Sequence, residues 1–182
     1  MRAPLLAASS FTAALSLVAL GAPGAGAAGP ATVVTGRFAP AGAGAAVTFA
    51  PDLVPFGAQV QLVAGQLGGR TEVRLTVQGL APWHSFPVHA HTGACGAAPT
   101  DSGPHYQDQV DPVQPSTDPA YANDRNELHL LLSTDGTGHA EARAELDWTF
   151  RPGEARSVVL HAGADAGGHP ASERVACVDV PF

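Results

Sequence analysis

Residues 139–150 read HAEARAELDWTF and alternate between polar and apolar side chains. One face of this segment carries His139 and charged residues, and the other carries alanines, Leu146, Trp148 and Phe150. Side chains of a β-strand point alternately to opposite sides, so the pattern predicts a strand with one buried face. Residues 71–78, TEVRLTVQ, alternate in the same way and predict a second strand of this kind.

Turn residues and short apolar runs extend this pattern along the chain. Asp135 and Gly136 lie between the apolar residues 128–132 and the strand at 139–150, which is a signal for a β-hairpin. Further short strands are expected at 157–160 and 175–180. With 21 Gly and 16 Pro and no helical period after the first 27 residues, the sequence predicts an all-β sandwich or barrel.

The first 27 residues have the layout of a secretory signal peptide. Arg2 precedes an apolar run, and small residues ending in Ala27 follow it. The alternative is a membrane helix, but the run is shorter than the ~20 residues that a span needs. We therefore expect cleavage after Ala27, a domain at 28–182 without a membrane span, and a secreted or periplasmic location. Residues 28–45 are either a flexible leader or include a first strand at 32–37.

Cys95 and Cys177 are the two cysteines of the chain. A protein exported to an oxidising compartment would pair them in a disulfide. The alternative, a thiolate catalyst, is disfavoured because such a compartment is not reducing.

The charge of the chain excludes one class of partner. Its net charge is −7, and its nine basic residues are all Arg and do not form a basic tract. A large nucleic-acid interface needs clustered cations to neutralise phosphates, so we expect no nucleic-acid partner.

Four of the eight histidines form a ligand pattern. His89 and His91 are two residues apart, so in a strand both imidazoles project to one side. His105 lies in a long loop at 93–126, and His161 ends an apolar run at the start of a second loop at 162–173. Four nitrogen donors suit Cu(II), although zinc also accepts three histidines and water. The alternative is a surface strand that carries the His pair by chance.

Several short segments, in consistent order from residue 71 to the C-terminus, resemble the copper/zinc superoxide dismutase family. They are VHAH at 88–91, Cys95, GPHY at 103–106, VVLH at 158–161 followed by Asp165, and RVAC at 174–177. The resemblance implies an immunoglobulin-like Greek-key β-sandwich or barrel with two long loops over a metal site. It also implies conversion of superoxide to oxygen and hydrogen peroxide.

The resemblance assigns a role to each matching residue. The implied copper ligands are His89, His91, His105 and His161. His105 is also implied to carry a proton, and Arg174 to attract the superoxide anion beside copper. Asp165 is implied to hydrogen-bond a copper ligand, and Cys95 and Cys177 to form the disulfide. The alternatives are a surface ion pair of Arg174 with Glu173, and a solvated Asp165.

The chain departs from the family pattern at zinc. Residues 106–127 contain no His, and their acidic residues are Asp108, Asp111, Asp118, Asp124 and Glu127. Structural zinc prefers nitrogen and sulfur ligands, so we expect copper with either no zinc or a poor zinc site. In this respect the sequence resembles copper-only variants of the family.

The other four histidines are expected to be incidental. His139 faces outward on its strand, and His129, near the hairpin, is at most a stray zinc ligand. His84 and His169 lie in loops, and His169 could approach the site.

Two other functions remain open on this sequence. A copper buffer or carrier with little or no dismutase turnover would have the same ligand set. A structural or adhesive β-sandwich with a vestigial His cluster would bind no copper tightly. A homodimer is possible, but the sequence does not decide this.

Overall fold

The structure is a computed structural model that describes residues 31–164 and 172–182. Residues 1–27, predicted to be a signal peptide, and Asp165 lie outside this part. The elements are β1 (Ala31–Arg37), β2 (Ala46–Thr48), β3 (Gln59–Leu67), β4 (Arg70–Gln78), β5 (Ser85–His91), the 3₁₀ helix η1 (Pro99–Ser102), β6 (His129–Ser133), β7 (Ala140–Leu146), β8 (Ser157–His161) and β9 (Arg174–Asp179). No described helix is long and apolar enough to cross a membrane.

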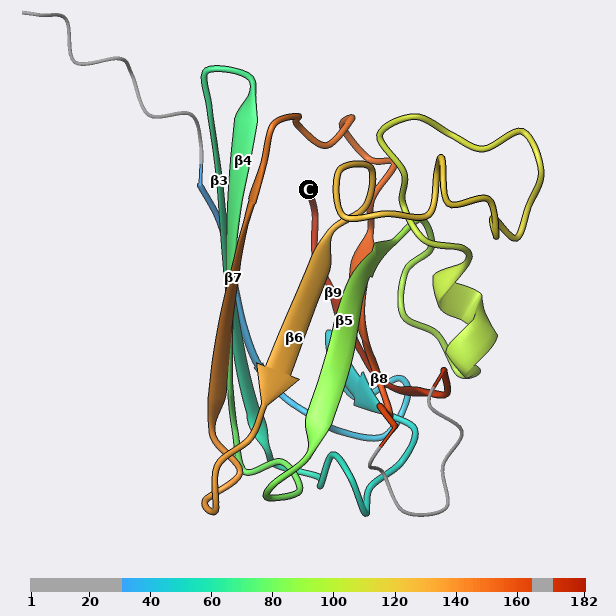
Figure 1. The fold of residues 1–182 in the computed structure, drawn as a ribbon. Helices are drawn as coiled ribbons and strands as arrows, with labels where there is room; N and C mark the ends of the chain where they lie inside the picture. Colours follow the sequence, from blue (N-terminus) through green and yellow to red (C-terminus); the bar gives the residue numbers. More distant parts are fainter. Residues whose placement is uncertain (1–30, 165–171) are drawn as a thin grey trace, which may run out of the picture.

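The strands form two antiparallel sheets that pack face to face (Figure 1). One sheet has the order β1-β3-β4-β7, and the other has the order β2-β9-β8-β5-β6. The predicted all-β class is confirmed. Among the described strands the two sheets do not join into a closed barrel, so the fold is a sandwich.

Alternating side chains of both sheets fill the space between them. Val73, Leu75 and Val77 of β4 are buried, whereas the intervening residues of this strand are mostly exposed. The alternation predicted for residues 139–150 also holds, although β7 itself ends at Leu146 and the chain buries Trp148 after the strand. Burial of each such large apolar side chain contributes about 1.5–3 kcal/mol, which fixes which face of each strand points outward.

The apolar stretch at 32–37 is a strand and not a leader. Its strand β1 pairs with β3 along its whole length. It therefore forms one edge of the first sheet.

The hairpin predicted around Asp135 and Gly136 is wrong. The turn itself is present, since Gly138 N donates to Asp135 O at 3.0 Å. However, β6 pairs with β5 in one sheet, and β7 pairs with β4 in the other. Gly79 and Leu80 donate their N–H groups to the carbonyl of Gly138, which ties the start of β7 to the end of β4. The turn residues thus determine a reversal of the chain but not which strands pair.

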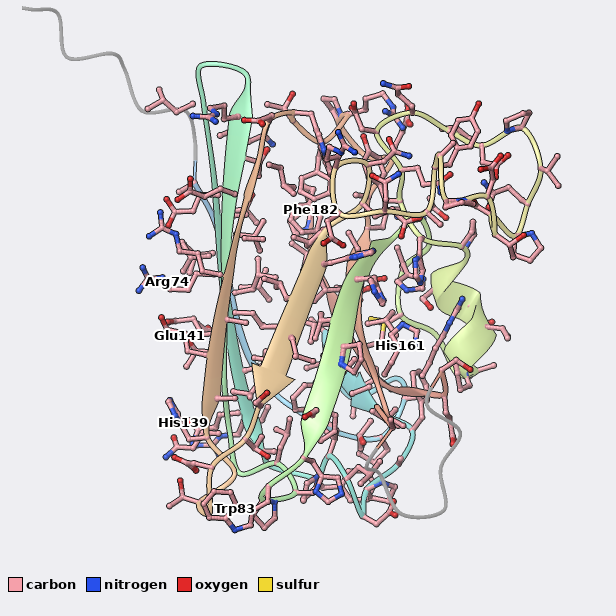
Figure 2. The ribbon with its side chains drawn as sticks, in the orientation of Figure 1. Arg74, Trp83, His139, Glu141, His161 and Phe182 are labelled. Carbon is pink, nitrogen blue, oxygen red and sulfur yellow. A yellow bond between two sulfur atoms is a disulfide. The ribbon has the colours of Figure 1, made fainter. Side chains whose placement is uncertain are left out.

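The long connection between β5 and β6 lies against the five-stranded sheet, on the side away from the core. In Figure 2, His161 lies between that sheet and the side of the molecule where η1 runs. Arg74, Glu141 and His139 lie on the side of the four-stranded sheet and point outward, away from the core. The sandwich therefore has one solvated sheet face and one face that is partly covered by a loop.

Candidate metal centre

Strand β5 places two histidines on the covered face of its sheet. Phe86, Val88 and Ala90 point into the core, so His89 and His91 project to the other side. His91 is completely buried there. The sequence prediction that both imidazoles share one side of a strand is confirmed.

His161 reaches the same place from the neighbouring strand. In the antiparallel pairing of β5 with β8, Val159 lies opposite His89, so His161 follows on the same face. A register irregularity lies between Leu160 and His161. The ring centroids of His89 and His161 are 5.0 Å apart.

The loop after β5 folds back and delivers His105 to these rings. Tyr106 N donates to the carbonyl of Ala90 at 2.8 Å, and His105 forms an isolated bridge with His91. The ring of His105 lies 4.2 Å from that of His89 and 4.8 Å from that of His91. All four histidines predicted as ligands therefore meet in one cluster.

The nitrogens of this cluster fit a metal ion. One ligand atom each of His89, His105 and His161 lies within 4.8 Å of the others. In addition, three buried ring nitrogens have no hydrogen-bond partner in the part of the chain that the structure describes, namely His89 Nδ1, His91 Nε2 and His161 Nε2. A buried polar atom without a partner costs about 1–3 kcal/mol, so several in one cluster indicate a ligand. A group of three histidines that can hold a metal ion is thus present.

Hydrogen bonds on the far side of the rings select the tautomers. His91 Nδ1 donates to the carbonyl of Gly103 at 2.9 Å, and His161 Nδ1 donates to that of Ser172 at 3.0 Å. Because a carbonyl only accepts, each Nδ1 carries the proton and each Nε2 keeps its lone pair. Such partners orient metal-binding imidazoles and raise their basicity.

Burial keeps these histidines neutral. Burial, together with the charge of the neighbouring His105, lowers the pKa of His89 to about 2 and that of His91 to about 3. Burial also lowers the pKa of His161. A metal ion binds the neutral imidazole, so proton competition at these residues is weak near neutral pH.

A buried carboxylate, Glu127, links His105 to His129. Oε2 of Glu127 accepts from His105 Nδ1 and from His129 Nε2, both at 3.0 Å, and Oε1 accepts from Gln107 Nε2 at 2.8 Å. Burial opposes ionisation of this side chain, which is only 3% exposed. The hydrogen bonds outweigh burial and hold the pKa of Glu127 well below its usual range.

His129, expected to be incidental, also lies against this cluster. Its ring lies 4.7 Å from that of His89, because the two residues face each other in the β5–β6 pairing. The hydrogen bond to Glu127 raises the pKa of His129, and Asp124 adds to this effect. Glu127 and His129 are two residues apart, and β6 begins at His129. This spacing is a sequence signal that the two side chains project to the same side.

The remaining histidines lie elsewhere or outside the described residues. His139 is exposed, as predicted, beside the outer face of the opposite sheet. His84 is in a loop, where its ring stacks on Phe86. His169 and Asp165 belong to the undescribed residues 165–171, so their predicted positions stay untested.

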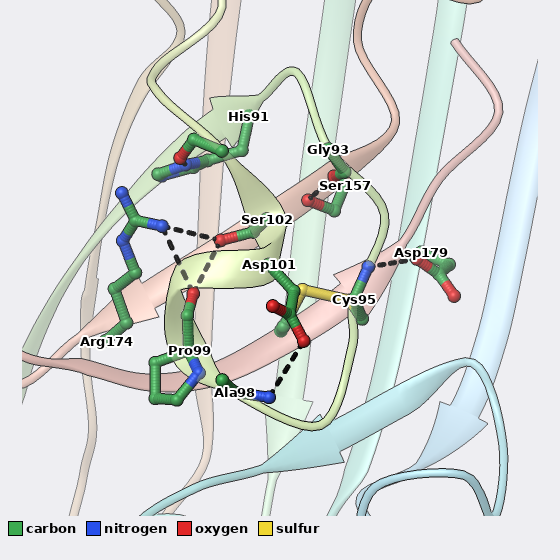
Figure 3. Close-up of a disulfide and its surroundings, with 12 residues drawn as sticks. His91, Gly93, Cys95, Ala98, Pro99, Asp101, Ser102, Ser157, Arg174 and Asp179 are labelled. Atoms are coloured by element: carbon green, nitrogen blue, oxygen red, sulfur yellow. Dashed lines mark hydrogen bonds between the residues drawn. A yellow bond between two sulfur atoms is a disulfide. The ribbon is translucent and has the colours of Figure 1, made fainter. Parts of the chain in front are cut away.

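Arg174 lies beside the cluster, opposite His161 in the β8–β9 pairing. Its Nη1 donates to the carbonyl of Pro99 at 3.1 Å and to Ser102 Oγ at 2.9 Å. Figure 3 shows the guanidinium of Arg174 next to the ring of His91. Its positive charge contributes to the lowered pKa of both His91 and His161.

The predicted disulfide between Cys95 and Cys177 is present (Figure 3). Cys177 lies on β9, three residues after Arg174, and Cys95 lies in the loop that leads to η1. Cys95 N also donates to Asp179 Oδ1 at 2.7 Å. The bond therefore fastens the loop that carries His105 to the strand that carries Arg174.

Comparisons with known proteins assign no family to this chain. No protein-family model matches the chain, and no curated protein matches it either. The similarity to the copper/zinc superoxide dismutases thus remains a resemblance in short motifs, and the geometry described above carries the functional argument.

Proposed function

We propose that this protein is a copper-dependent superoxide dismutase that works without zinc. The proposed copper ligands are His89, His91, His105 and His161. The observation that carries the proposal is the cluster of these four rings, in which three buried nitrogens have no hydrogen-bond partner among the described residues. A set of four imidazole nitrogens is the donor set that Cu(II) favours.

The contact between Glu127 and His105 supports the absence of zinc. A histidine that bridges two metals must use both ring nitrogens as ligands. Here Nδ1 of His105 lies 3.0 Å from a carboxylate oxygen of Glu127 and donates a hydrogen bond to it. That nitrogen is therefore occupied by a hydrogen bond, and one metal per chain is expected.

The residues of the site supply the other requirements of the reaction. Copper, when bound, exchanges one electron with each superoxide. Arg174 attracts the small anion, and its guanidinium stays charged at every working pH, although burial lowers its pKa. Two superoxide anions and two protons give one oxygen and one hydrogen peroxide. Glu127 holds the proton on Nδ1 of His105, so Nε2 is the atom of His105 that can release or accept one.

The disulfide supports a location outside the cytoplasm, because such bonds persist in oxidising compartments. We place the mature protein in the periplasm or the extracellular space. Superoxide is the proposed small-molecule partner.

The test measures superoxide decay by pulse radiolysis with the copper-loaded protein. The proposal predicts catalytic decay that Arg174→Ala slows about 10-fold, because the local attraction for the anion is lost. Arg74→Ala is the matched control, since it removes the same charge from the opposite sheet face (Figure 2). Its rate should stay within about twofold of the unsubstituted protein.

Two results would overturn the proposal. Copper binding without catalytic decay would instead support a copper buffer or carrier. No tight copper binding would support the structural alternative.

A further inference from the structure

Ser102 is hydrogen-bonded to Arg174. This serine is the last residue of η1 and is 1% exposed. Its Oγ lies 2.9 Å from Nη1 of Arg174 and 2.9 Å from the carbonyl oxygen of Pro99. Because a guanidinium nitrogen only donates, Oγ accepts from Arg174 and donates its own hydrogen to Pro99. Nη1 also donates to the carbonyl of Pro99. The guanidinium, the hydroxyl and the carbonyl are therefore each hydrogen-bonded to the other two (Figure 3).

The segment that carries Ser102 is packed too tightly to adapt. Gly93 N donates to the carbonyl of Ser102 at 2.7 Å. A Cβ on Gly93 would lie 2.3 Å from the carbonyl oxygen of Asp101, and one on Gly96 would lie 2.2 Å from its Oδ2. The disulfide between Cys95 and Cys177 then ties the loop before η1 to β9. Ser102 therefore has a fixed position relative to Arg174.

The next residue positions a histidine of the cluster. The carbonyl of Gly103 accepts from His91 Nδ1 at 2.9 Å. The end of η1 thus orients a proposed ligand through Gly103 and the guanidinium through Ser102. Among the described residues, Pro99 and Ser102 are the hydrogen-bond partners found for the Arg174 side chain.

We propose that Ser102 is a positioning residue whose hydroxyl holds the Arg174 guanidinium in place to bind a small anion at the histidine cluster. The inference rests on the proposed function for the identity of that anion. Without the hydroxyl, the Pro99 carbonyl is the one acceptor left for the guanidinium among residues 31–164 and 172–182, and a single hydrogen bond lets the guanidinium rotate. Anion binding must then order this side chain, which weakens affinity.

The first test titrates azide, a small anion, into the copper-loaded protein and follows its absorption. Ser102→Ala should weaken azide binding about 5- to 10-fold with an unchanged copper content, as expected for a lost hydrogen bond to a charged group. The matched control is Ser157→Ala. Ser157 is also fully buried, and its Oγ donates to the carbonyl of Gly93 in the same loop at 2.7 Å. Its azide affinity should stay within about twofold.

A double-mutant cycle separates positioning from a general loosening of the loop. If Ser102 acts through Arg174, Ser102→Ala should have no further effect on azide affinity in an Arg174→Ala background. The same fold-change in both backgrounds, or an equal loss in Ser157→Ala, would overturn the inference.

A measurement on the metal-free protein keeps this inference distinct from the proposed function. The guanidinium ¹⁵N–¹H signals of Arg174, assigned with Arg174→Lys, report rotation of its Nη groups. We expect slow rotation in the unsubstituted protein and in Ser157→Ala, and fast rotation in Ser102→Ala. Slow rotation in Ser102→Ala would contradict the role of Ser102. Failure to bind copper would contradict the proposed function and leave this measurement intact.

Discussion

Nδ1 of His105 lies 3.0 Å from Oε2 of Glu127, and the same oxygen accepts from Nε2 of His129. One buried carboxylate therefore joins a proposed copper ligand to a histidine on a neighbouring strand. Negatively charged partners of this kind fix the tautomer of a metal-binding imidazole and strengthen its metal bond. Glu127 is the residue on which the proposed absence of zinc most depends.

Glu127→Gln should lower copper affinity about 10- to 100-fold. The neutral amide cannot make the two charge-assisted hydrogen bonds that the carboxylate makes to His105 and His129. Competition titration with a copper chelator measures the change.

Asp124→Asn is the matched control for Glu127→Gln. Asp124 is an exposed partner of His129 and has no described contact with His105. Its copper affinity should remain near that of the unsubstituted protein. Equal affinities for Glu127→Gln and the unsubstituted protein would show that the carboxylate does not support the site.

The metal-free protein should lose stability as the pH falls below 6.5. In the unfolded chain His takes up a proton near pH 6.5, whereas burial holds the pKa of His89 at about 2 and that of His91 at about 3. From pH 6.5 downward the unfolded chain therefore binds protons that the folded protein does not. The free energy of unfolding falls by up to about 1.4 kcal/mol per pH unit for each of these residues.

His129 does not offset this loss. Its pKa is raised by the hydrogen bond to Glu127, so its contribution is complete below pH 6.5 and is lost only as the pH rises. Urea unfolding between pH 7 and about 5 checks the prediction. His91→Gln should flatten the dependence, and His139→Gln, on the exposed face, should preserve it. A stability that does not change over this range would contradict the burial argument.

Replacing both cysteines with serine should destabilise the protein by about 4–5 kcal/mol in the chain-entropy view. The bond closes a separation of 82 residues, which is long for a domain of this size. Urea unfolding of the double variant measures the loss. A loss below about 1 kcal/mol would show that the loop stays in place without its covalent tie.

Arg151 should control the mobility of the loop that leads to Glu127. Its Nη1 donates to the carbonyl of Asp108 at 2.6 Å, and its Nη2 donates to that of Gln107 at 2.9 Å. The guanidinium also lies over the ring of Tyr106, 4.7 Å from the centroid. A lysine cannot reproduce this fork, so Arg151→Lys should speed amide hydrogen exchange in residues 107–126 about 10-fold or more.

Arg143→Lys provides the comparison for Arg151. Arg143 makes ion pairs with Glu72 and Glu145 on the solvated face of the opposite sheet. Exchange in residues 107–126 should not change in this variant. An unchanged exchange rate in Arg151→Lys as well would mean that the loop is held by its other contacts.

Local patterns predicted the parts of the fold that depend on neighbouring residues. The period of two in residues 71–78 and 139–150 identified the buried faces, and the spacing of His89 and His91 identified a shared side. The disulfide between Cys95 and Cys177 could be predicted from the expected oxidising compartment alone, because the chain has no other cysteine. Strand β3 was missed, because alanine and glycine in Gln59–Leu67 weaken its contrast between polar and apolar positions.

These local patterns could not predict which distant strands pair with each other. The turn at Asp135 suggested a hairpin, but the strands on its two sides belong to different sheets. The contact of His129 with the cluster depends on the register that sets it opposite His89. Glu127 looked like one of several loop acids, and only its burial beside His105 distinguishes it.

The most direct test of the account is the metal content of the purified protein after it is offered copper and zinc together. We predict one copper per chain, no retained zinc, and electron paramagnetic resonance with coupling to histidine nitrogens. His161→Ala should lower this copper retention, and His84→Ala should not. A protein that keeps no copper after desalting, or that binds zinc in its place, would contradict the account.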